Sequence, residues 1–461
     1  MNIDKKPIKG KECKFSVHIP TRDPDIPDFH YIKERIHYED GTTEPNVRIV
    51  KNFKRSYWVT KPSKRSFTQK KEYMLVDDLL EKKVTQSDLR ISIARALEKQ
   101  WSRDSLKSLC SSPYIYGADI SSTSLIKKQY KTTYPECVSE FTVAGLDIET
   151  DVINGTEDVI IISIIYKDKA FLAVVKDFVR YIANPEQRFQ EICNVYLKEY
   201  LDKHKITPEI YVANSSLDAI TKVFEKAHLW QPDFMEIWNI DFDITKIIES
   251  IKRSGADPSD ILCDPKIPKE LRICKYIRGT QKKITASGNV QPINPAAQWH
   301  TLQLTASFYV IDGMCAYKQI RLMSEQEQTS YSLDNILQKE LGIRKLKFKE
   351  ADAYTGLSWH KFMQTNHKIE YLVYNLFDSL SMLELDQKTL DLSYTLPNFA
   401  ATTDFSRFNS QPTRIADELH HFLLERNKVI GSTGKSSYDS DEDESLDLKG
   451  WIEYSFYYKK L

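Results

Sequence analysis

The stretch "VAGLDIETD", residues 143–151, combines an apolar strand-like run with two acidic residues near its end. Side chains alternate across a strand, so Asp147 and Glu149, two residues apart, project from the same face. Two carboxylates this close repel each other and resist desolvation unless a cation or a proton lies between them. Two interpretations are open: the strand ends in water and the pair is harmless, or a positive group belongs beside it.

The residues that follow this stretch predict a three-stranded meander. "DVINGTED" (151–158) contains Asn154-Gly155, a strong hairpin-turn signal, and it precedes the strand-like runs "VIIISIIY" (159–166) and "AFLAVV" (170–175). The pattern then continues with helices over 187–204 and 217–229, the strand "FMEIWN" (234–239) and the helix "ITKIIESIKRSG" (244–255).

The carboxyl-terminal half contains one especially clear helical pattern. In "IEYLVYNLFDSLSMLELD" (369–386), apolar residues recur at helical spacing. The other predicted segments are a strand-rich region (272–312), a short helix "SYSLDNILQKELG" (330–342), a last amphipathic helix "TRIADELHHFLLERNKVIG" (413–431), an acidic linker "SSYDSDEDESLD" (436–447) and a strand-like aromatic tail (449–461).

The composition is typical of a soluble globular protein, since the 461 residues are 41% hydrophobic and 28% charged, enough for two or three domains. Lysine plus arginine equals aspartate plus glutamate, 65 each, so the net charge says nothing about partners. The amino terminus has no apolar signal core, and the longest apolar run is far below the about 20 residues of a membrane helix. Seven cysteines without a Cys-x-x-Cys pair fit a reducing compartment. We therefore expect a cytoplasmic protein without a membrane partner, in the host cytoplasm if the source is viral.

The amino-terminal region has short strand-like runs and one helix-like segment near 86–101, which predicts a small β-rich domain. Between Asn46 and Lys71 it contains no acidic residue, and its basic residues interleave with aromatic ones. That mixture suits a nucleic-acid backbone with stacking platforms beside it, although an exposed basic β-surface with inward aromatic residues fits equally well. The candidate DNA-binding residues of this stretch are Arg48, Lys51, Lys54, Arg55, Lys61, Lys64 and Arg65.

Two further carboxylates lie at notable places in the predicted elements. Asp243 in "IWNIDFDITKI" (237–247) lies where a strand gives way to a helix, which is also the position of an ordinary helix N-cap. Tyr374 and Asp378 are four residues apart on the long helix, so they lie on one side of it, next to the apolar stripe. The alternative to a functional pair is a core tyrosine beside an aspartate that reaches solvent.

Taken together, the acidic positions form an ordered set drawn from three distant segments. Four carboxylates supply hard oxygen ligands, which suit Mg²⁺ or Mn²⁺. Two such ions about 3.5–4 Å apart would hold a phosphodiester, activate a water and stabilise the leaving oxygen. The positive group expected beside the 143–151 strand is then a catalytic metal.

The motifs "LDIET" (146–150), "WNIDFD" (238–243) and "YNLFD" (374–378), in this order, resemble the three exonuclease motifs of family B DNA polymerases, particularly the bacteriophage type. "FYVIDGMCAYKQI" (308–320), followed by the 330–342 helix, is similar to the family's strand and helix between the second and third motifs. The resemblance implies an α/β, ribonuclease H-like DEDDy exonuclease domain with a mixed central sheet flanked by helices. It implies an N-terminal domain (1–138), the exonuclease domain (139–390) and a return segment (391–461) that packs on the N-terminal domain and ends, after an acidic loop, in a truncated start of the palm.

The resemblance also implies roles for individual residues. Tyr374 would hydrogen-bond the attacking water or the scissile phosphate. The ligands of two Mg²⁺ or Mn²⁺ ions would be Asp147, Glu149, Asp243 and Asp378.

The second motif has its own implied contacts. Asn239 and Phe242 match positions that contact the frayed 3′ strand in the family. Only Ile240 and Asp241 separate them, one residue fewer than the usual spacing, and Asp241 is the less favoured alternative to Asp243 as a ligand.

The polymerase motifs of the family, "DxxSLYPS", "KxxxNSxYG" and "DTD", do not occur in the 461 residues. We therefore expect the 3′–5′ proofreading subunit of a split polymerase in DNA replication, with palm, fingers and thumb on a second polypeptide. The alternatives are a free-standing DNA exonuclease, a truncated chain, or a non-catalytic nucleic-acid-binding scaffold of a replisome. The expected partners are single-stranded DNA or a primer 3′ end and the polymerase polypeptide, with a sliding clamp as a further candidate.

Overall fold

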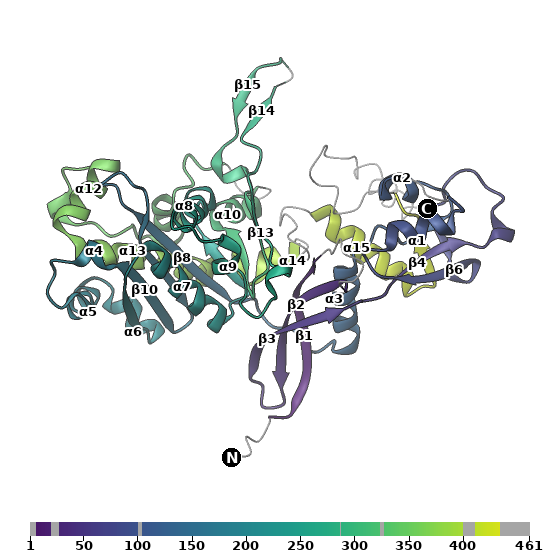
Figure 1. Cartoon of the computed structure of the whole chain (residues 1–461), viewed down its shortest axis with the longest axis horizontal. Helices are drawn as coiled ribbons and strands as arrows, with labels where there is room; N and C mark the ends of the chain where they lie inside the picture. The colour runs from purple at the N-terminus through teal and green to yellow at the C-terminus, as the bar shows by residue number, and fades with distance from the viewer. Residues whose placement is uncertain are drawn as a thin grey trace. The chain divides into compact units, whose positions relative to one another are not determined.

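Figure 1 shows the computed structural model of the chain, which describes residues 6–19, 27–99, 104–285, 287–322, 327–399 and 411–433. The acidic segment 436–447 and the tail 449–461 lie outside these residues. Within the described part, no helix combines the length and the apolar character needed to cross a lipid bilayer. The chain divides into two compact units: unit 1 is Met1–Thr43, Val47–Cys137 and Phe399–Leu461, and unit 2 is Glu44–Asn46 and Val138–Asn398.

Unit 1 is built around strands that form three small sheets. The first has the order β1-β2-β3, the second has the order β6-β4-β7, and the third pairs β18 with β5. Its elements are β1 (Ile8–Ile19), β2 (Phe29–Tyr38), β3 (Thr43–Lys51), β4 (Arg55–Thr60), β5 (Tyr73–Leu75), β6 (Leu79–Val84), α1 (Leu89–Ala96), α2 (Leu106–Cys110), β7 (Ile115–Tyr116), α3 (Ser122–Thr133), α15 (Gln411–Leu424) and β18 (Lys428–Ile430).

The chain returns to unit 1 through α15 and β18. The sequence pattern predicts one helix over 413–431, but the helix ends at Leu424 and a strand follows it. Asn427 adopts the left-handed conformation, with φ 59°, which is incompatible with a continued right-handed helix. Val429 is fully buried and pairs with Met74 of β5. The apolar residues after the helix therefore extend the core as a strand.

Unit 2 is organised around a six-stranded mixed sheet with the order β11-β10-β9-β8-β12-β17. β8, β9 and β10 form the predicted antiparallel meander, in which Asp147 pairs with Ser163 of β9. β12 runs parallel to both β8 and β17, and β11 runs parallel to β10. The strands are β8 (Val143–Thr150), β9 (Val159–Tyr166), β10 (Lys169–Val175), β11 (Thr207–Ala213), β12 (Phe234–Ile237), β13 (Cys274–Ile277), β14 (Lys282–Ile284), β15 (Val290–Pro292), β16 (Thr301–Leu304) and β17 (Tyr309–Asp312).

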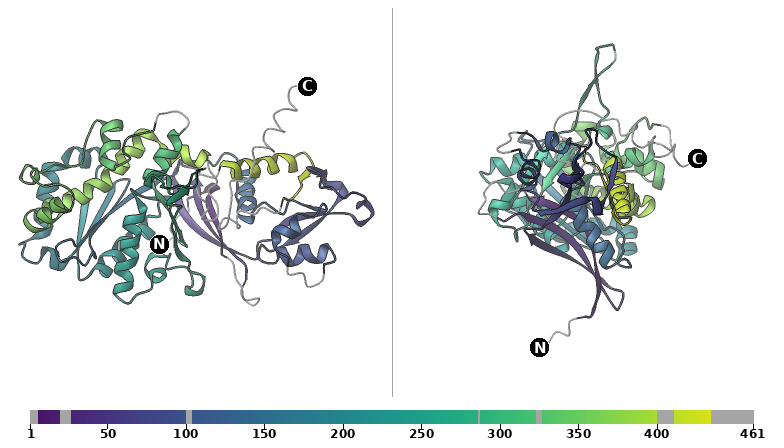
Figure 2. Two further views of the ribbon diagram at one scale, coloured as in Figure 1. Left: turned by 90° about the horizontal axis from the view of Figure 1, so that it is seen from above. Right: turned by 90° about the vertical axis from the view of Figure 1, so that its right-hand side faces the viewer.

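Helices cover both faces of this sheet (Figure 2) and bury two apolar layers. On one face, Ile161 belongs to the same cluster as Leu376 of α13, and on the other, Leu146 clusters with Phe224 of α7. Alternation along β8 thus turns Asp147 toward α13 while its neighbour Leu146 faces α7. The helices are α4 (Lys176–Val179), α5 (Pro185–Tyr196), α6 (Lys198–His204), α7 (Ser216–Trp230), α8 (Ile240–Arg253), α9 (Pro258–Leu262), α10 (Gly313–Arg321), α11 (Leu333–Leu341), α12 (Gly356–Asn366), α13 (Lys368–Thr389) and α14 (Leu396–Phe399).

A glycine lets α13 lie close against β8. Gly145 precedes Asp147 by two residues and therefore shares its face of the strand. A Cβ atom on Gly145 would lie 2.5 Å from the backbone oxygen of Ser379 in α13, closer than real Cβ contacts. The same helix is bonded to the neighbouring strand, because the Ser379 hydroxyl lies 2.8 Å from Ser163 Oγ. The sequence of β8 thus provides both the acidic pair and the space for the helix above it.

Several elements of unit 2 differ from the sequence-based expectations. The 187–204 helix is divided at Leu197 into α5 and α6. Helix α8 begins at Ile240, so Asp243 lies in its first turn, and the interpretation of this aspartate as an N-cap is wrong. The pattern does not predict β11 or α12, although the Thr355 and Ser358 side chains at the start of α12 form a capping box, which is a recognisable start signal.

Candidate metal centre

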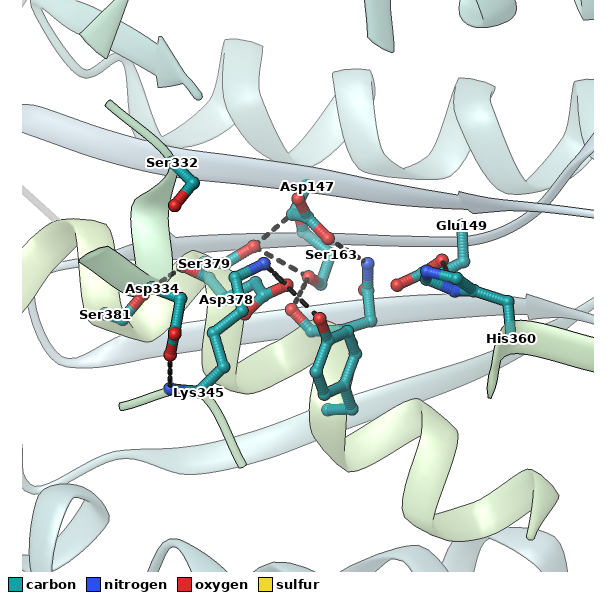
Figure 3. A network of polar contacts seen from close by, with 12 residues as sticks. Asp147, Glu149, Ser163, Ser332, Asp334, Lys345, His360, Asp378, Ser379 and Ser381 are labelled. Carbon is teal, nitrogen blue, oxygen red and sulfur yellow. Dashed lines mark hydrogen bonds and ion pairs between the residues drawn. The ribbon is translucent and has the colours of Figure 1, made fainter. Parts of the chain in front are cut away.

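The acidic residues of β8 meet a carboxylate of α13 on the face of the sheet that α13 covers (Figure 3). One ligand oxygen from each of Asp147, Glu149 and Asp378 lies within 4.8 Å of the others. Asp243, in the first turn of α8, is also buried and is close enough to Asp147 and Glu149 to be affected by their charges. The structure thus brings three of the four predicted carboxylates into one cluster and places the fourth near it.

Burial and mutual repulsion disfavour the ionised forms of these carboxylates. Burial, followed by the charges of Asp378, Asp243 and Glu149, raises the pKa of Asp147 well above its usual value. Burial and the charge of Glu149 likewise raise the pKa of Asp243. Burial raises the pKa of Asp378 to about 6, although Lys345 opposes the shift. A site of this kind keeps its carboxylates ionised at neutral pH only when positive charge lies among them.

Lys345, in the loop that follows α11, supplies one positive charge. Its Nζ lies 2.6 Å from Asp378 Oδ2 and 3.4 Å from the Tyr374 hydroxyl. Burial works against the ammonium form, but Asp378, Tyr374 and Asp147 raise the pKa of Lys345 well above its usual value. Asp334 of α11 fixes the loop, because its Oδ1 accepts a hydrogen bond from the Lys345 backbone N–H at 2.9 Å. One ammonium group cannot balance four carboxylates, so full ionisation of the site requires further positive charge.

The donor set fits a divalent cation. Asp378 Oδ1 is buried without a hydrogen-bond partner in the described part of the chain, which is unfavourable unless a ligand satisfies it. Asp147 and Glu149 each have one oxygen held by a neighbouring side chain, Asn375 and Tyr371 respectively. Carboxylate oxygens are the ligands that Mg²⁺ and Mn²⁺ prefer. The residues present are therefore suited to these ions.

Tyr374 lies one helical turn before Asp378 on the same side of α13. It is 9% exposed, and its ring centroid lies 4.8 Å from that of Trp359 in α12. Burial and the charge of Asp378 raise the pKa of the Tyr374 phenol well above its usual value. The phenol therefore stays neutral and retains a proton that it can donate to a water or a phosphate oxygen.

The other residues of the second motif surround the start of α8. Asn239 adopts a left-handed conformation, with φ 72°, and its side chain makes no cap hydrogen bond. Phe242 is 48% exposed, which leaves its ring available for contact with a base. Asp241 accepts hydrogen bonds from the Tyr276 hydroxyl at 2.6 Å and from Arg278 Nε at 3.1 Å. Both bonds reach Oδ1 of Asp241, and it is the charge of Asp243, not that of Asp241, that affects Asp147.

Sequence reasoning missed four polar residues that contact the cluster or its supports. Lys345 lies in a loop, where no periodic pattern marks it. Tyr371 and Asn375 lie within the apolar sequence of α13, and their spacing of four residues was the available signal. His360 of α12 lies beside Glu149, with Nδ1 2.7 Å from the Tyr371 hydroxyl and 3.6 Å from Glu149 Oε2.

The predicted DNA-binding residues of the amino-terminal stretch do not share one environment. The prediction is wrong for Arg55, which is 1% exposed and donates to the backbone oxygen of Gly117 at 2.8 Å. Arg65 is partly buried and donates to the backbone oxygen of Thr60 at 3.1 Å, and Lys61 is partly buried as well. The exposed members of the set, for which a nucleic-acid contact stays a prediction, are Arg48, Lys51, Lys54 and Lys64.

Part of the chain is similar to a known protein. The chain is 26% identical over 215 residues to a DNA-directed DNA polymerase of Escherichia phage RB69. The matched segment is 45% of this chain and covers 20% of the length of that polymerase. No protein-family model matches the chain. The match supports a protein related to family B DNA polymerases, the family that the three motifs resemble.

Proposed function

We propose that the protein is a metal-dependent 3′–5′ exonuclease that removes nucleotides from single-stranded or frayed DNA 3′ ends. The observation that carries the proposal is the convergence of Asp147, Glu149 and Asp378, with Asp243 near them, on one site whose full ionisation needs more positive charge than Lys345 supplies. The mixed sheet with helices on both faces is consistent with a ribonuclease H-like domain. The similarity to a phage DNA polymerase supports DNA as the substrate.

The side chains of the site would divide the work of phosphodiester hydrolysis. Two Mg²⁺ or Mn²⁺ ions, when bound, supply an activated water and neutralise charge on the phosphate and the leaving oxygen. Asp147, Glu149, Asp243 and Asp378 would hold these ions. Tyr374 would donate its phenol proton to the attacking water or a phosphate oxygen and so orient it.

The contacts at the rim of the site suit a single strand. Phe242, half exposed one residue before Asp243, would stack on a base of the frayed end. Such stacking is tolerant of sequence, since every base has an aromatic face. A proofreading nuclease needs that tolerance, because any of the four bases can be misincorporated.

We also propose that the exonuclease proofreads for a polymerase carried on a second polypeptide. The relative is named a DNA polymerase, and the matched segment covers 20% of its length. The partner would be encoded in a separate reading frame that contains the Ser-Leu-Tyr-Pro-Ser motif. Co-purification of such a product with this chain is the expected result, and an intact polymerase encoded elsewhere, with no such frame, would favour a free-standing exonuclease.

The activity is tested with a single-stranded DNA labelled at its 5′ end. The expected result is a ladder of products that shorten from the 3′ end only when Mg²⁺ or Mn²⁺ is present. The double substitution Asp147→Ala with Glu149→Ala is expected to abolish the ladder but retain binding of the strand. Binding without shortening by the unaltered protein would instead favour the non-catalytic scaffold. A matched RNA strand, tested beside the DNA, determines the preference for the sugar.

A further inference from the structure

We propose that Tyr371 and Asn375 are positioning residues of the candidate metal centre, which hold one oxygen each of Glu149 and Asp147 so that the second oxygens face a divalent cation. The inference rests on the proposed function, because it concerns the same site. Two contacts carry it. The Tyr371 hydroxyl donates a hydrogen bond to Glu149 Oε2, and Asn375 Nδ2 donates to Asp147 Oδ2 at 2.6 Å.

Helix α13 presents two adjacent polar rows to this site. Tyr374 and Asp378 form the row with the predicted catalytic roles, and Tyr371 and Asn375 form a second row, also with a spacing of four residues. Tyr371 and Asn375 are both 0% exposed. The second row therefore faces the protein interior and cannot reach solvent or substrate directly.

The second row matches the acidic strand in register. Four helical residues rise about 6 Å, and two strand residues span about 6.6 Å, so a row on α13 can follow alternate residues of β8. The helix row and the strand residues run in opposite directions. Tyr371, the earlier residue of the row, contacts Glu149, and Asn375 contacts the earlier strand residue, Asp147. One step further along both elements, Ser379 lies over Gly145, where a Cβ atom would not fit. The close packing at the glycine thus brings the whole row within hydrogen-bonding distance.

Helix α12 fixes the orientation of the Tyr371 phenol. The hydroxyl has one proton, and an ionised Glu149 can only accept it. His360 Nδ1, 2.7 Å from the same hydroxyl, must then carry its own proton and donate it to the phenol oxygen. Gln364 Nε2 lies 3.4 Å from the hydroxyl and donates to the Thr150 backbone oxygen at 2.8 Å. These contacts connect α12, α13 and the end of β8 around a single glutamate oxygen.

The side chain of Asn375, like that of Tyr371, is oriented toward its carboxylate partner. The amide nitrogen faces Asp147 Oδ2, which is the orientation that suits an ionised carboxylate beside a cation, since such a carboxylate only accepts. Asn375 Oδ1 is consequently buried without a hydrogen-bond partner among the described residues. An orphaned amide oxygen is unfavourable in the interior, and stability alone would favour an apolar residue at this position. The asparagine therefore serves the carboxylate rather than the core.

The consequence is a defined set of oxygens for the ion. Asp378 Oδ2 is held by Lys345 at 2.6 Å, as Asp147 Oδ2 and Glu149 Oε2 are held by the second row. In the described part of the chain, no hydrogen bond occupies the other oxygens, which are Asp147 Oδ1, Glu149 Oε1 and Asp378 Oδ1. Hydrogen bonds to the second oxygen of a ligating carboxylate orient it and reduce the entropy lost on binding.

The test is the affinity of the full chain for Mn²⁺, measured by calorimetric titration without DNA. Tyr371→Phe and Asn375→Ala are each expected to weaken Mn²⁺ binding by about 10- to 100-fold, the usual effect of removing an outer hydrogen-bond partner of a ligand. The matched control is Tyr317→Phe, because Tyr317 is also buried and its hydroxyl donates to Glu340 elsewhere in unit 2. The control is expected to bind Mn²⁺ within about twofold of the unaltered chain.

A double-substitution cycle separates positioning from general stability. Once Glu149 is replaced in Glu149→Gln, adding Tyr371→Phe is expected to change Mn²⁺ affinity by less than about twofold, because the carboxylate that the phenol orients is gone. Full additivity of the two losses would overturn the proposal for Tyr371. If Tyr371→Phe lowers the melting temperature more than Tyr317→Phe does, its weaker Mn²⁺ binding can be due to lost stability. The Mn²⁺ affinity of Asn375→Ala then decides whether the proposal holds.

The possible failures are distinguishable. A chain that binds Mn²⁺ and trims DNA, and does both unchanged after Tyr371→Phe and Asn375→Ala, overturns this inference and leaves the proposed function intact. An unaltered chain that binds no Mn²⁺ overturns the proposed function itself.

Discussion

The two units bury titratable groups of opposite kinds. Unit 1 buries histidines: burial, with the charge of His18, lowers the pKa of His30 to about 4, and burial lowers the pKa of His420 to about 3. Unit 2 buries carboxylates, and burial raises the pKa values of Asp147 and Asp378. In both units the interior favours the neutral form of the group. The same physical effect therefore makes the two units respond to pH in opposite directions.

The two kinds of buried group also differ in what explains them: core packing accounts for the histidines of unit 1, but not for the carboxylates of unit 2. A neutral imidazole is compatible with an apolar interior, and His420 lies with its ring centroid 6.3 Å from that of Trp58. Carboxyl groups can also become neutral by protonation, but a protonated cluster has lost the charge that it could offer to a ligand. Placing Asp147, Glu149 and Asp378 together is thus understandable when a cation binds among them.

The largest expected effect follows from removing the acidic pair. Asp147→Ala with Glu149→Ala is expected to lower the nuclease rate by roughly a thousandfold, since metal-ion catalysis contributes several kcal/mol and each 1.4 kcal/mol is a factor of ten. Without added metal, unit 2 is expected to melt at the same or a higher temperature, because repulsion within the cluster is relieved. Single-turnover cleavage and calorimetry check the two parts. A strongly lowered melting temperature would show that the pair serves stability rather than chemistry.

Acidification is expected to affect the two units oppositely. Histidine has a pKa of 6.5 in the unfolded chain, whereas the pKa of folded His30 is about 4. As pH falls from 6.5 to 4, the unfolded state of unit 1 therefore takes up the proton first, and unit 1 loses stability. The 2.5-unit difference corresponds to on the order of 3 kcal/mol. Asp378 behaves in the opposite way, because its pKa is about 6 in the folded protein and 3.8 in the unfolded chain. As pH falls, the folded state therefore takes up this proton first. Unit 2, free of divalent ions, therefore gains stability as pH falls from about 7 to 4.

Calorimetry in the presence of a chelator checks this opposition. The transition of unit 2 is the one that added Mg²⁺ raises, because a ligand stabilises only the state that binds it. Between about pH 7 and pH 5, the unit 1 transition should move to lower temperature and the unit 2 transition to higher temperature. Parallel shifts of both transitions would contradict the comparison.

A smaller effect is expected from the packing of α13 on β8. Gly145→Ala introduces a Cβ atom 2.5 Å from a backbone oxygen of Ser379, so unit 2 is expected to lose about 1–3 kcal/mol of unfolding free energy, as in other overpacked cores. Nuclease activity should fall as well, since the helix carries Tyr374 and Asp378. The control is Gly155→Ala, which has open space around it and suffers only from its positive φ of 68°. Denaturant titration of both variants measures the difference.

The smallest expected effect concerns the histidines of unit 1. Both ring nitrogens of His420 are buried without a hydrogen-bond partner among the described residues. His420→Leu replaces the ring by an apolar side chain and is expected to stabilise unit 1 at about pH 5 by about 1 kcal/mol, with less effect at neutral pH. The partly exposed His37 serves as control in His37→Leu. Equal effects of the two substitutions at both pH values would contradict the role of burial.

The local patterns of β8 and α13 carry enough information to predict the site's main residues. Alternation places Asp147 and Glu149 on one face, and a spacing of four places Tyr374 beside Asp378. These rules are local and hold wherever the element forms. The motif resemblance then connects segments that are more than 200 residues apart in the sequence, which no local rule does.

What could not be predicted depends on contacts between distant segments. Lys345 lies in a loop whose position is set by Asp334 and not by any periodicity of its own. Arg55 lies in a basic stretch typical of a surface, but carbonyl groups of Gly117 and Ile120 surround its guanidinium in the interior. Tyr371 lies in an apolar helix, so its sequence context is that of an ordinary core residue. Its hydrogen bond to Glu149 becomes visible only in the folded structure. Propensity and pattern do not encode such partners.

The most direct test of the metal centre is the anomalous scattering of Mn²⁺ in crystals of the full chain. The predicted result is a strong anomalous peak at coordination distance from carboxylate oxygens of Asp147, Glu149 and Asp378 together. Crystals that show those three side chains around no ion at saturating Mn²⁺, or that place them apart from one another, would contradict the account.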